Sequence, residues 1–129
     1  MGNIVNTFPK EERLNSKNNI DLLFKKGESF VHFPFRIVYV RLSDEDLSAR
    51  AAMFVSVPKK KFKRAVKRNF LKRRVKESYR LNKSNLLSIL EQKQQRLAIA
   101  FLYLDKEIRD YENIEKKMVE SLEILYSKL

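Results

Sequence analysis

The 129-residue sequence contains no cysteine, only two glycines and a single histidine. Without cysteine, neither a disulfide bond nor a thiolate metal site can form, and a reducing compartment is compatible with the chain. One histidine cannot supply the ligand set of a zinc site. The glycines, Gly2 and Gly27, lie too far apart for a glycine-rich phosphate loop. We therefore predict no catalytic residues and no metal site in the protein itself.

Long apolar segments are also absent. The longest charge-free apolar run, LAIAFLYL at 97–104, is far shorter than the roughly 20 residues of a membrane helix. The opening residues, MGNIVNTFPKEER, lack the basic start and apolar centre of a signal peptide. A chain of this length that is 43% hydrophobic suits one core. We expect a soluble cytoplasmic protein with a single domain over residues 1–129 and no membrane partner.

Acidic residues are scarce in one segment in particular. Residues 59–80, KKKFKRAVKRNFLKRRVKESYR, contain 12 lysines and arginines and one acid, Glu77. The whole chain has 28 basic and 16 acidic residues, so the part outside this segment is nearly neutral. An even spread of lysine would serve solubility equally well. The concentration of positive charge therefore predicts a polyanionic partner.

The first half of the chain is predicted to contain a helix and two strands. Ser16 or Asn18 can cap a helix over 16–26, and Gly27 can close it. Alternation of side chains with a period of two predicts strands over 33–42 and 49–57. A polar turn separates these strands, and we expect them to form an antiparallel pair.

The second half begins with the basic segment and a polar stretch to about Arg96. Residues 97–104 are apolar on both faces, which predicts a central strand. A final helix over 111–128 has a packing face at helical spacing, formed by Ile114, Met118, Leu122 and Leu125. The order of helix, two or three strands, helix, strand and helix predicts an α+β fold in which helices pack on one small mixed β-sheet.

The basic segment has the periodicity of an amphipathic helix. Its narrow apolar side consists of Leu71, Val75 and Ser78, flanked by Tyr79. A polar stripe on the other side, with steps of three or four residues, comprises Asn69, Lys72, Arg73, Lys76 and Arg80. A disordered tail does not need such an apolar stripe. We therefore expect a helix that docks on the domain and displays a cationic face.

The cationic face has two interpretations, a solvated surface or a binding surface. Like charges four residues apart, such as Lys72 and Lys76, each cost a few tenths of a kcal/mol. A helix that served solubility alone would interleave acids, as residues 105–123 do. A polyphosphate partner would relieve the repulsion, and arginine would bind it through bidentate donation. The binding interpretation is favoured.

At these residues the sequence resembles the protein subunit of bacterial ribonuclease P. The helix motif of that family is matched by Lys59-Lys60, Ala65-Val66, Arg68-Asn69, Lys72-Arg73 and Glu77, with Arg80 beyond it. Near the start, the family's pattern is matched by Arg13-Leu14, Phe24 and Gly27. Two departures exist: the loop after Lys60 lacks a frequent glycine and is one residue longer, and Lys76 stands where arginine is usual.

The resemblance implies a fold and a function. The fold is the ribosomal protein S5 domain 2-like arrangement, with a rare left-handed βαβ crossover. The partners are the ribonuclease P RNA subunit and precursor tRNA, with no DNA. The RNA subunit carries catalysis, and Mg²⁺ is held mainly by the RNA and the substrate, with no cofactor in the protein alone. Removal of the 5′ leader of precursor tRNA is the implied reaction.

The resemblance also implies two sets of site residues. Contact with RNA is expected from Lys59, Lys60, Arg68, Asn69, Lys72, Arg73, Lys76 and Arg80. A cleft for the single-stranded leader is expected to include Phe24, Arg36 and Val38. Phe24 could stack on unpaired bases, although a phenylalanine four residues after Ile20 is more often part of a core. Arg36 either faces a ligand or extends to an edge of the sheet.

Other interpretations stay open. A non-catalytic RNA-binding protein, such as a ribosome-associated factor, would have the same charge asymmetry. A helix that binds anionic membrane is disfavoured, because the narrow apolar face of the basic helix is needed for the core. Asp44-Glu45-Asp46 could chelate a hard cation, but a turn of three acids is more often solvated. His32 lies next to apolar residues and is expected to be structural.

Overall fold

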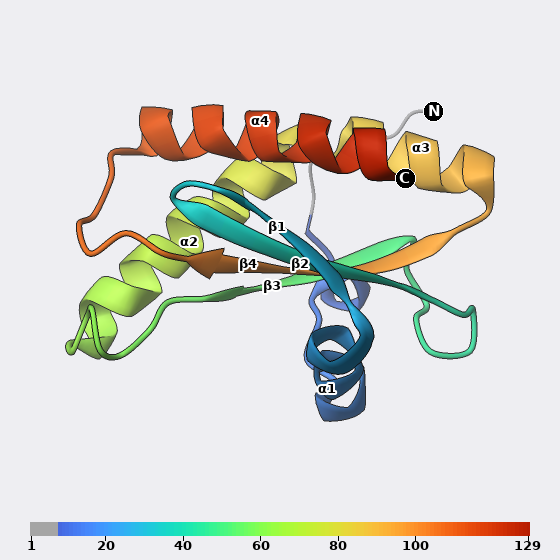
Figure 1. Ribbon diagram of the computed structural model, residues 1–129, viewed down its shortest axis with the longest axis horizontal. Helices are drawn as coiled ribbons and strands as arrows, with labels where there is room; N and C mark the ends of the chain where they lie inside the picture. The colour runs from blue at the N-terminus through green and yellow to red at the C-terminus, as the bar shows by residue number, and fades with distance from the viewer. Residues whose placement is uncertain (1–7) are drawn as a thin grey trace.

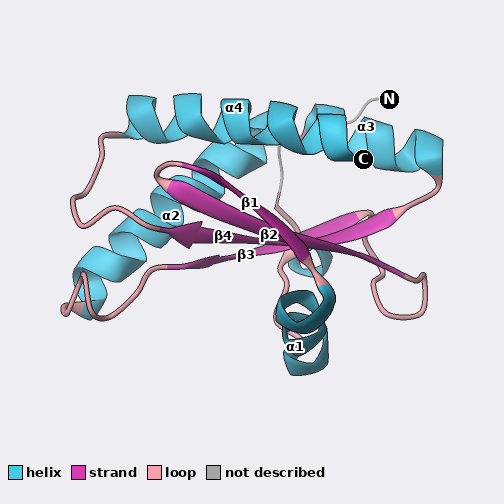
Figure 2. Cartoon of the chain, in the orientation of Figure 1, coloured by secondary structure: helices cyan, strands magenta, loops and turns pink. Residues whose placement is uncertain are grey.

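The computed structural model describes residues 8–129, and its four strands form one mixed sheet (Figures 1 and 2). The first seven residues of the segment compared with a signal peptide lie outside the described part. The elements in chain order are a short 3-10 helix Lys10–Glu12, α1 Lys17–Lys26, β1 Glu28–His32, β2 Phe35–Leu42, β3 Ala51–Ser56, α2 Ala65–Asn82, α3 Ser84–Lys93, β4 Arg96–Tyr103 and α4 Tyr111–Lys128.

Strand β4 is central in the sheet, as its two apolar faces predicted. The strand order is β1-β2-β4-β3, with β4 antiparallel to β2 and parallel to β3. The prediction that strands 33–42 and 49–57 pair with each other is wrong, because β4 lies between them. The physical reason is burial: six of the eight β4 residues are buried, so this strand needs a partner on each edge.

The connection from β3 to β4 forms a left-handed crossover, as the resemblance implied. Helices α2 and α3 lie between these parallel strands in the chain and cover one face of the sheet. Seen from the helix side with both strands pointing away, β4 lies to the left of β3 (Figure 1). Such connections are right-handed in the great majority of proteins. Without the resemblance, the general preference for right-handed connections would therefore have predicted the opposite hand.

The two faces of the sheet are covered unequally. Helices α2, α3 and α4 pack on one face and α1 on the other (Figure 2). The larger core contains the inward faces of α2 and α4, including the four residues predicted for the last helix, Ile114, Met118, Leu122 and Leu125. The smaller core joins Leu14 and Leu23 to one side of β2, β3 and β4. One ten-residue helix covers only part of that face.

Besides the short 3-10 helix Lys10–Glu12, two elements were not separately predicted. Strand β1 covers five residues and pairs antiparallel with β2, filling the place of the optional third strand. Helix α3 lies inside the stretch interpreted as polar, and it buries only Leu86 and Leu90. Two apolar residues four apart are a weak periodic signal. The chain therefore gains a helix from tertiary packing that its local pattern barely indicates.

Gly27 closes α1, but for a reason other than backbone conformation. Its φ is −73°, which any residue adopts, and Ser16 caps the other end by accepting from the Asn19 backbone N–H. A Cβ atom on Gly27 would lie 2.2 Å from the Leu23 carbonyl oxygen and 3.0 Å from that of Tyr39. Close approach of two backbone segments therefore requires glycine here.

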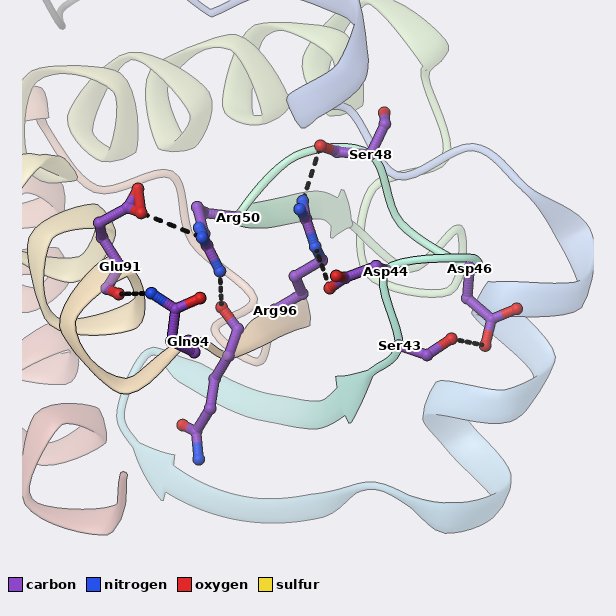
Figure 3. A network of polar contacts seen from close by, with 9 residues as sticks. Ser43, Asp44, Asp46, Ser48, Arg50, Glu91, Gln94 and Arg96 are labelled. Carbon is purple, nitrogen blue, oxygen red and sulfur yellow. Dashed lines mark hydrogen bonds and ion pairs between the residues drawn. The ribbon is translucent and has the colours of Figure 1, made fainter.

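The turn between β2 and β3 is fixed by two arginines (Figure 3). Arg96 donates to the Asp44 carboxylate and to the Ser48 carbonyl, both at 2.7 Å. Arg50 donates to the Glu91 carboxylate at 3.0 Å and to the Gln95 carbonyl at 3.4 Å. The Arg96 hydrogen bond lowers the pKa of Asp44. The acidic turn therefore supplies the ion-pair partner of Arg96, the first residue of β4.

Candidate nucleic-acid interface

Helix α2 has one buried side and one exposed side, as predicted. Leu71, Val75, Ser78 and Tyr79 are fully buried. Tyr79 packs on Phe101 of β4, with ring centroids 5.9 Å apart, which fixes the rotation of the helix on the sheet. The polar stripe predicted for the helix therefore lies on its solvent side, around Asn69 and Arg73, which are both exposed.

The cations of this segment lack acidic partners over most of its length. Among residues 8–129, none of the 11 lysines and arginines from Lys59 to Lys76 forms an ion pair; elsewhere the pairs include Arg50, Arg96 and Arg109. Arg80, at the end of the stripe, binds Glu77 at 2.7 Å and lowers the pKa of that carboxyl group. The positive charge is thus compensated only at one end of the surface.

Arg68 has a structural task in addition to its predicted one. One guanidinium nitrogen donates to the Phe62 carbonyl at 2.7 Å and to the Lys63 carbonyl at 2.9 Å. These hydrogen bonds fold the loop that carries Lys59 and Lys60 against the start of α2. Both lysines are exposed in that loop. The loop that carries these lysines is therefore tied to the first turns of α2.

Arg13 extends the basic surface beyond α2 and lies outside the polar stripe predicted for the helix. Burial and the nearby positive charges of Lys72 and Arg13 lower the pKa of Lys76. Arg13 forms an isolated bridge with Met53 on the outer edge of β3, so the surface continues from α2 across the sheet edge. In the sequence, Arg13 was indicated only by its match to the family's arginine–leucine pair. Spacing along the helix could not reveal it.

The open part of the sheet face beneath α1 carries the residues predicted for a cleft. The strand register aligns Val31, Arg36, Leu102 and Ser56 across the four strands, and the next row contains Val38 and Phe54. Arg36 is exposed and lies on the same face as α1. Val38 is only 6% exposed and packs in the smaller core, so its own contact area is small.

Phe24 is an exposed aromatic residue at the border of this face. It is 50% exposed, so the interpretation of Phe24 as a core residue is wrong. Its ring packs edge-on against Phe54 with centroids 5.9 Å apart, which holds it above the open rows of the sheet. The helix places Leu23 in the core, and the next residue therefore points to the flank. An exposed, oriented ring suits stacking on an unpaired base.

The remaining candidates have structural surroundings. His32 Nε2 lies 2.8 Å from the Glu120 carboxylate and links β1 to α4, in agreement with a structural role. Within the described residues, no three histidine or acidic side chains are placed to hold a metal ion. Every helix from residue 8 onward is too short or too polar to cross a bilayer. The site therefore consists of a cationic helix, its preceding loop and a partly open sheet face.

Known proteins share both the sequence and the fold of this chain. Residues 8–126 match the family model described as Ribonuclease P. A ribonuclease P protein component from Porphyromonas gingivalis is 45% identical over 113 residues, which cover 88% of this chain and 82% of that protein. One from Petrotoga mobilis is 41% identical over 78 residues, covering 60% and 62% of the two chains.

Solved structures give the same result for the fold. The RNase P protein of Staphylococcus aureus superimposes with a TM-score of 0.71 at 21% identity, covering 88% of this chain and 94% of that one. The RNase P protein from Thermotoga maritima has a TM-score of 0.68 at 24% identity and covers 88% and 96%. At such identities, the likeness concerns the α+β architecture.

Proposed function

The chain belongs to the ribonuclease P protein family, and from this membership we propose how its surfaces serve the ribonucleoprotein. The protein is the subunit that accompanies the ribonuclease P RNA in removing the 5′ leader of precursor tRNA. Its two exposed surfaces differ in chemistry: α2 with its preceding loop is cationic, while the open sheet face combines aromatic, aliphatic and arginine side chains. We assign a different RNA to each of them.

The surface on α2 binds the RNA subunit. The observation that carries this assignment is the set of 11 cations from Lys59 to Lys76 without an ion pair among the described residues. Five of them lie in the loop before α2 and six on the helix, whose other side is fully buried. Burial and, after it, the nearby charges of Lys72 and Arg13 lower the pKa of Lys76, and phosphates of a folded RNA would offset the repulsion from these charges. The contact residues are Lys59, Lys60, Arg68, Asn69, Lys72, Arg73, Lys76 and Arg80, together with Arg13.

The open sheet face binds the single-stranded leader. Phe24 offers a ring for an unpaired base, and Arg36 offers a cation for the adjoining phosphate. Val38 contributes the apolar floor beneath them. A flexible single strand fits a face that is only partly covered by one short helix.

Catalysis and metal binding belong to the RNA subunit in this proposal. The described residues contain no constellation of carboxylates or imidazoles that suits a magnesium site. Phosphate oxygens of RNA and substrate are better ligands for Mg²⁺, which retains its water and prefers hard oxygen donors. The protein would then contribute substrate affinity and charge compensation, and Mg²⁺ would be held mainly by the RNA and the precursor tRNA.

A processing assay tests this division of tasks. Protein alone with magnesium should leave precursor tRNA uncut, and protein with its cognate RNA should remove the leader at a magnesium concentration where the RNA alone is slow. Cleavage by the RNA-free protein at a comparable rate would contradict the proposal. If the protein binds ribosomal RNA but does not stimulate processing, the alternative of a ribosome-associated RNA-binding protein is correct.

A further inference from the structure

A second exposed aromatic side chain, Phe33, lies at the turn between β1 and β2. The residue is 49% exposed, and the guanidinium of Arg109 lies over its ring, 5.0 Å from the centroid. Neither residue belongs to the cationic helix or to the predicted leader cleft. An exposed phenylalanine alone is common on protein surfaces. The arrangement of its neighbours distinguishes Phe33 from an ordinary exposed side chain.

Arg109 is held in a fixed orientation. Its Nε donates to the Asp105 carboxylate at 2.8 Å, and Nη1 donates to the Asn113 side-chain oxygen at 2.7 Å. The hydrogen bond from Arg109 Nε to Asp105 helps to lower the pKa of this carboxyl group, so Asp105 stays ionised as the partner of Arg109. A guanidinium fixed from two sides supports one face of the Phe33 ring. Because about half of the residue's surface remains exposed beside this guanidinium, the ring is accessible to a planar ligand.

The turn that carries Phe33 is joined to the basic surface. The Leu104 backbone N–H donates to the Pro34 carbonyl at 2.7 Å, and the ammonium of Lys61 donates to the Leu104 carbonyl. These contacts place the β1–β2 turn, the loop after β4 and the loop before α2 at one end of the sheet (Figure 1). A ligand over Phe33 therefore lies at the same end of the sheet as Lys61.

The turn also continues the row of the leader cleft. Val31 is paired with Arg36 in the sheet and is 53% exposed, and Phe33 follows it by two residues. The exposed row of Arg36 and the Phe33 ring therefore adjoin along β1. We propose that Phe33, supported by Arg109, is a stacking platform for an unpaired base in the distal part of the leader. The inference rests on the proposed leader-binding function of the sheet face.

The test uses the ribonucleoprotein reconstituted from the protein and its cognate RNA. Binding is measured for precursor tRNA with a long leader and for one with a leader truncated to its first few nucleotides. Phe33→Ala should weaken binding of the long-leader substrate by roughly fivefold or more, the range expected for loss of one base–aromatic stack, and leave the truncated substrate unchanged. Phe33→Trp should retain the affinity, and Phe33→Leu should lose it although it remains apolar.

A second readout locates the contact within the leader. The fluorescence of 2-aminopurine, placed at one leader position at a time, should be quenched at a distal position by the native protein and by Phe33→Trp. Phe33→Ala should abolish this quenching. Leu81→Ala, which removes a similarly exposed apolar side chain from α2 (39% exposed), should change neither binding nor fluorescence.

The outcomes separate this inference from the function on which it rests. If Phe24→Ala weakens both substrates while Phe33→Ala has no effect, the platform is refuted and the leader cleft stands. If neither variant weakens binding, the leader-binding function itself fails. Equal losses for long and truncated leaders with Phe33→Ala would place the contact on the RNA subunit or the tRNA body and overturn the assignment to the leader.

Discussion

The β2–β3 turn and the basic segment 59–76 differ in how their positive charges are compensated. At the turn, Arg50 and Arg96 each bind a carboxylate and a backbone carbonyl (Figure 3). In the basic segment, the loop before α2 and the helix itself display cations that form no ion pair from Lys59 to Lys76 in the described chain. The compensated arginines hold the turn, whereas the repulsion among the uncompensated lysines and arginines is what we expect a bound phosphate backbone to relieve.

The largest effect is expected when the uncompensated segment loses charge. Lys72→Ala with Arg73→Ala should weaken RNA binding by roughly tenfold or more, since each charge-assisted contact contributes on the order of 1 kcal/mol. The salt dependence should flatten by about 0.9 units for each lost phosphate contact. The fold should survive, because alanine favours helix and the repulsion decreases. Binding at several salt concentrations, with circular dichroism, measures both effects.

The control for this variant is Lys93→Ala with Lys116→Ala, which removes the same formal charge from exposed positions of α3 and α4. This pair should change binding only slightly, through the long-range field. Equal losses from the two pairs would mean that the protein acts as a diffuse polycation.

The compensated turn should respond in stability instead. Arg50→Ala with Arg96→Ala removes two positive charges as well, but also the hydrogen bonds to the carbonyls of Gln95 and Ser48. Each such bond contributes about 1 kcal/mol, so thermal unfolding should occur at a lower temperature. The salt dependence of RNA binding should stay at its native value. A flattened salt dependence in this variant would show that both regions contact RNA.

Arg68 lies between the two classes, because it belongs to the cationic surface and also holds a loop. Arg68→Lys preserves the charge but cannot reproduce the planar contact with the carbonyls of Phe62 and Lys63. We expect a loss of about 1 kcal/mol in the free energy of unfolding. The salt slope of RNA binding should change little. A denaturant titration and a salt titration distinguish these contributions, and an unchanged unfolding midpoint would argue against the structural task.

The smallest expected effect is a change in the pKa of the Lys76 side chain. Its pKa is lowered in the folded protein by burial and by the charges of Lys72 and Arg13. Folding therefore disfavours the protonated form, and this lysine makes stability rise with pH between its folded and ordinary pKa. Bound phosphate should raise the pKa again, so that RNA binding takes up protons and weakens as pH rises across that window.

An NMR titration of the Lys76 side chain, with and without RNA, measures this shift. Arg13→Ala should raise the pKa in the free protein, because one of the neighbouring charges is removed. Lys76→Arg should abolish the proton uptake linked to this site. A Lys76 pKa that is the same in the free and bound protein would show that no phosphate lies beside it.

Local periodicity was sufficient to predict the orientation of α2 and α4. Leu71 and Val75 are buried because residues four apart share one side of a helix, and this relation requires no knowledge of the partner surface. The same holds for β4, whose composition alone indicates burial on both faces. The cationic stripe followed from the same rule, since the side opposite a buried stripe is exposed.

Other features depend on contacts between distant segments, and local patterns cannot reveal them. Whether Phe24 is buried depends on how much of the sheet α1 covers, and a ten-residue helix leaves the flank exposed. The proximity of Arg13 to Lys76 arises because the segment before α1 pairs with the edge of β3. The predicted pairing of β2 with β3 was wrong for the same reason. Strand β4, which follows both of them by more than 35 residues in the chain, lies between them in the sheet.

The central position of β4 has a consequence for the order in which the chain folds. The β1–β2 hairpin is local and can form as soon as residue 42 is synthesised. Strand β3 gains its partner strand only when residues 96–103 are available, and until then α2 has no complete sheet on which to bury Leu71 and Tyr79. A parallel pair closed over such a loop forms slowly. During synthesis the cationic helix therefore emerges before the surface that orients it, and the domain completes its folding as one late, cooperative step.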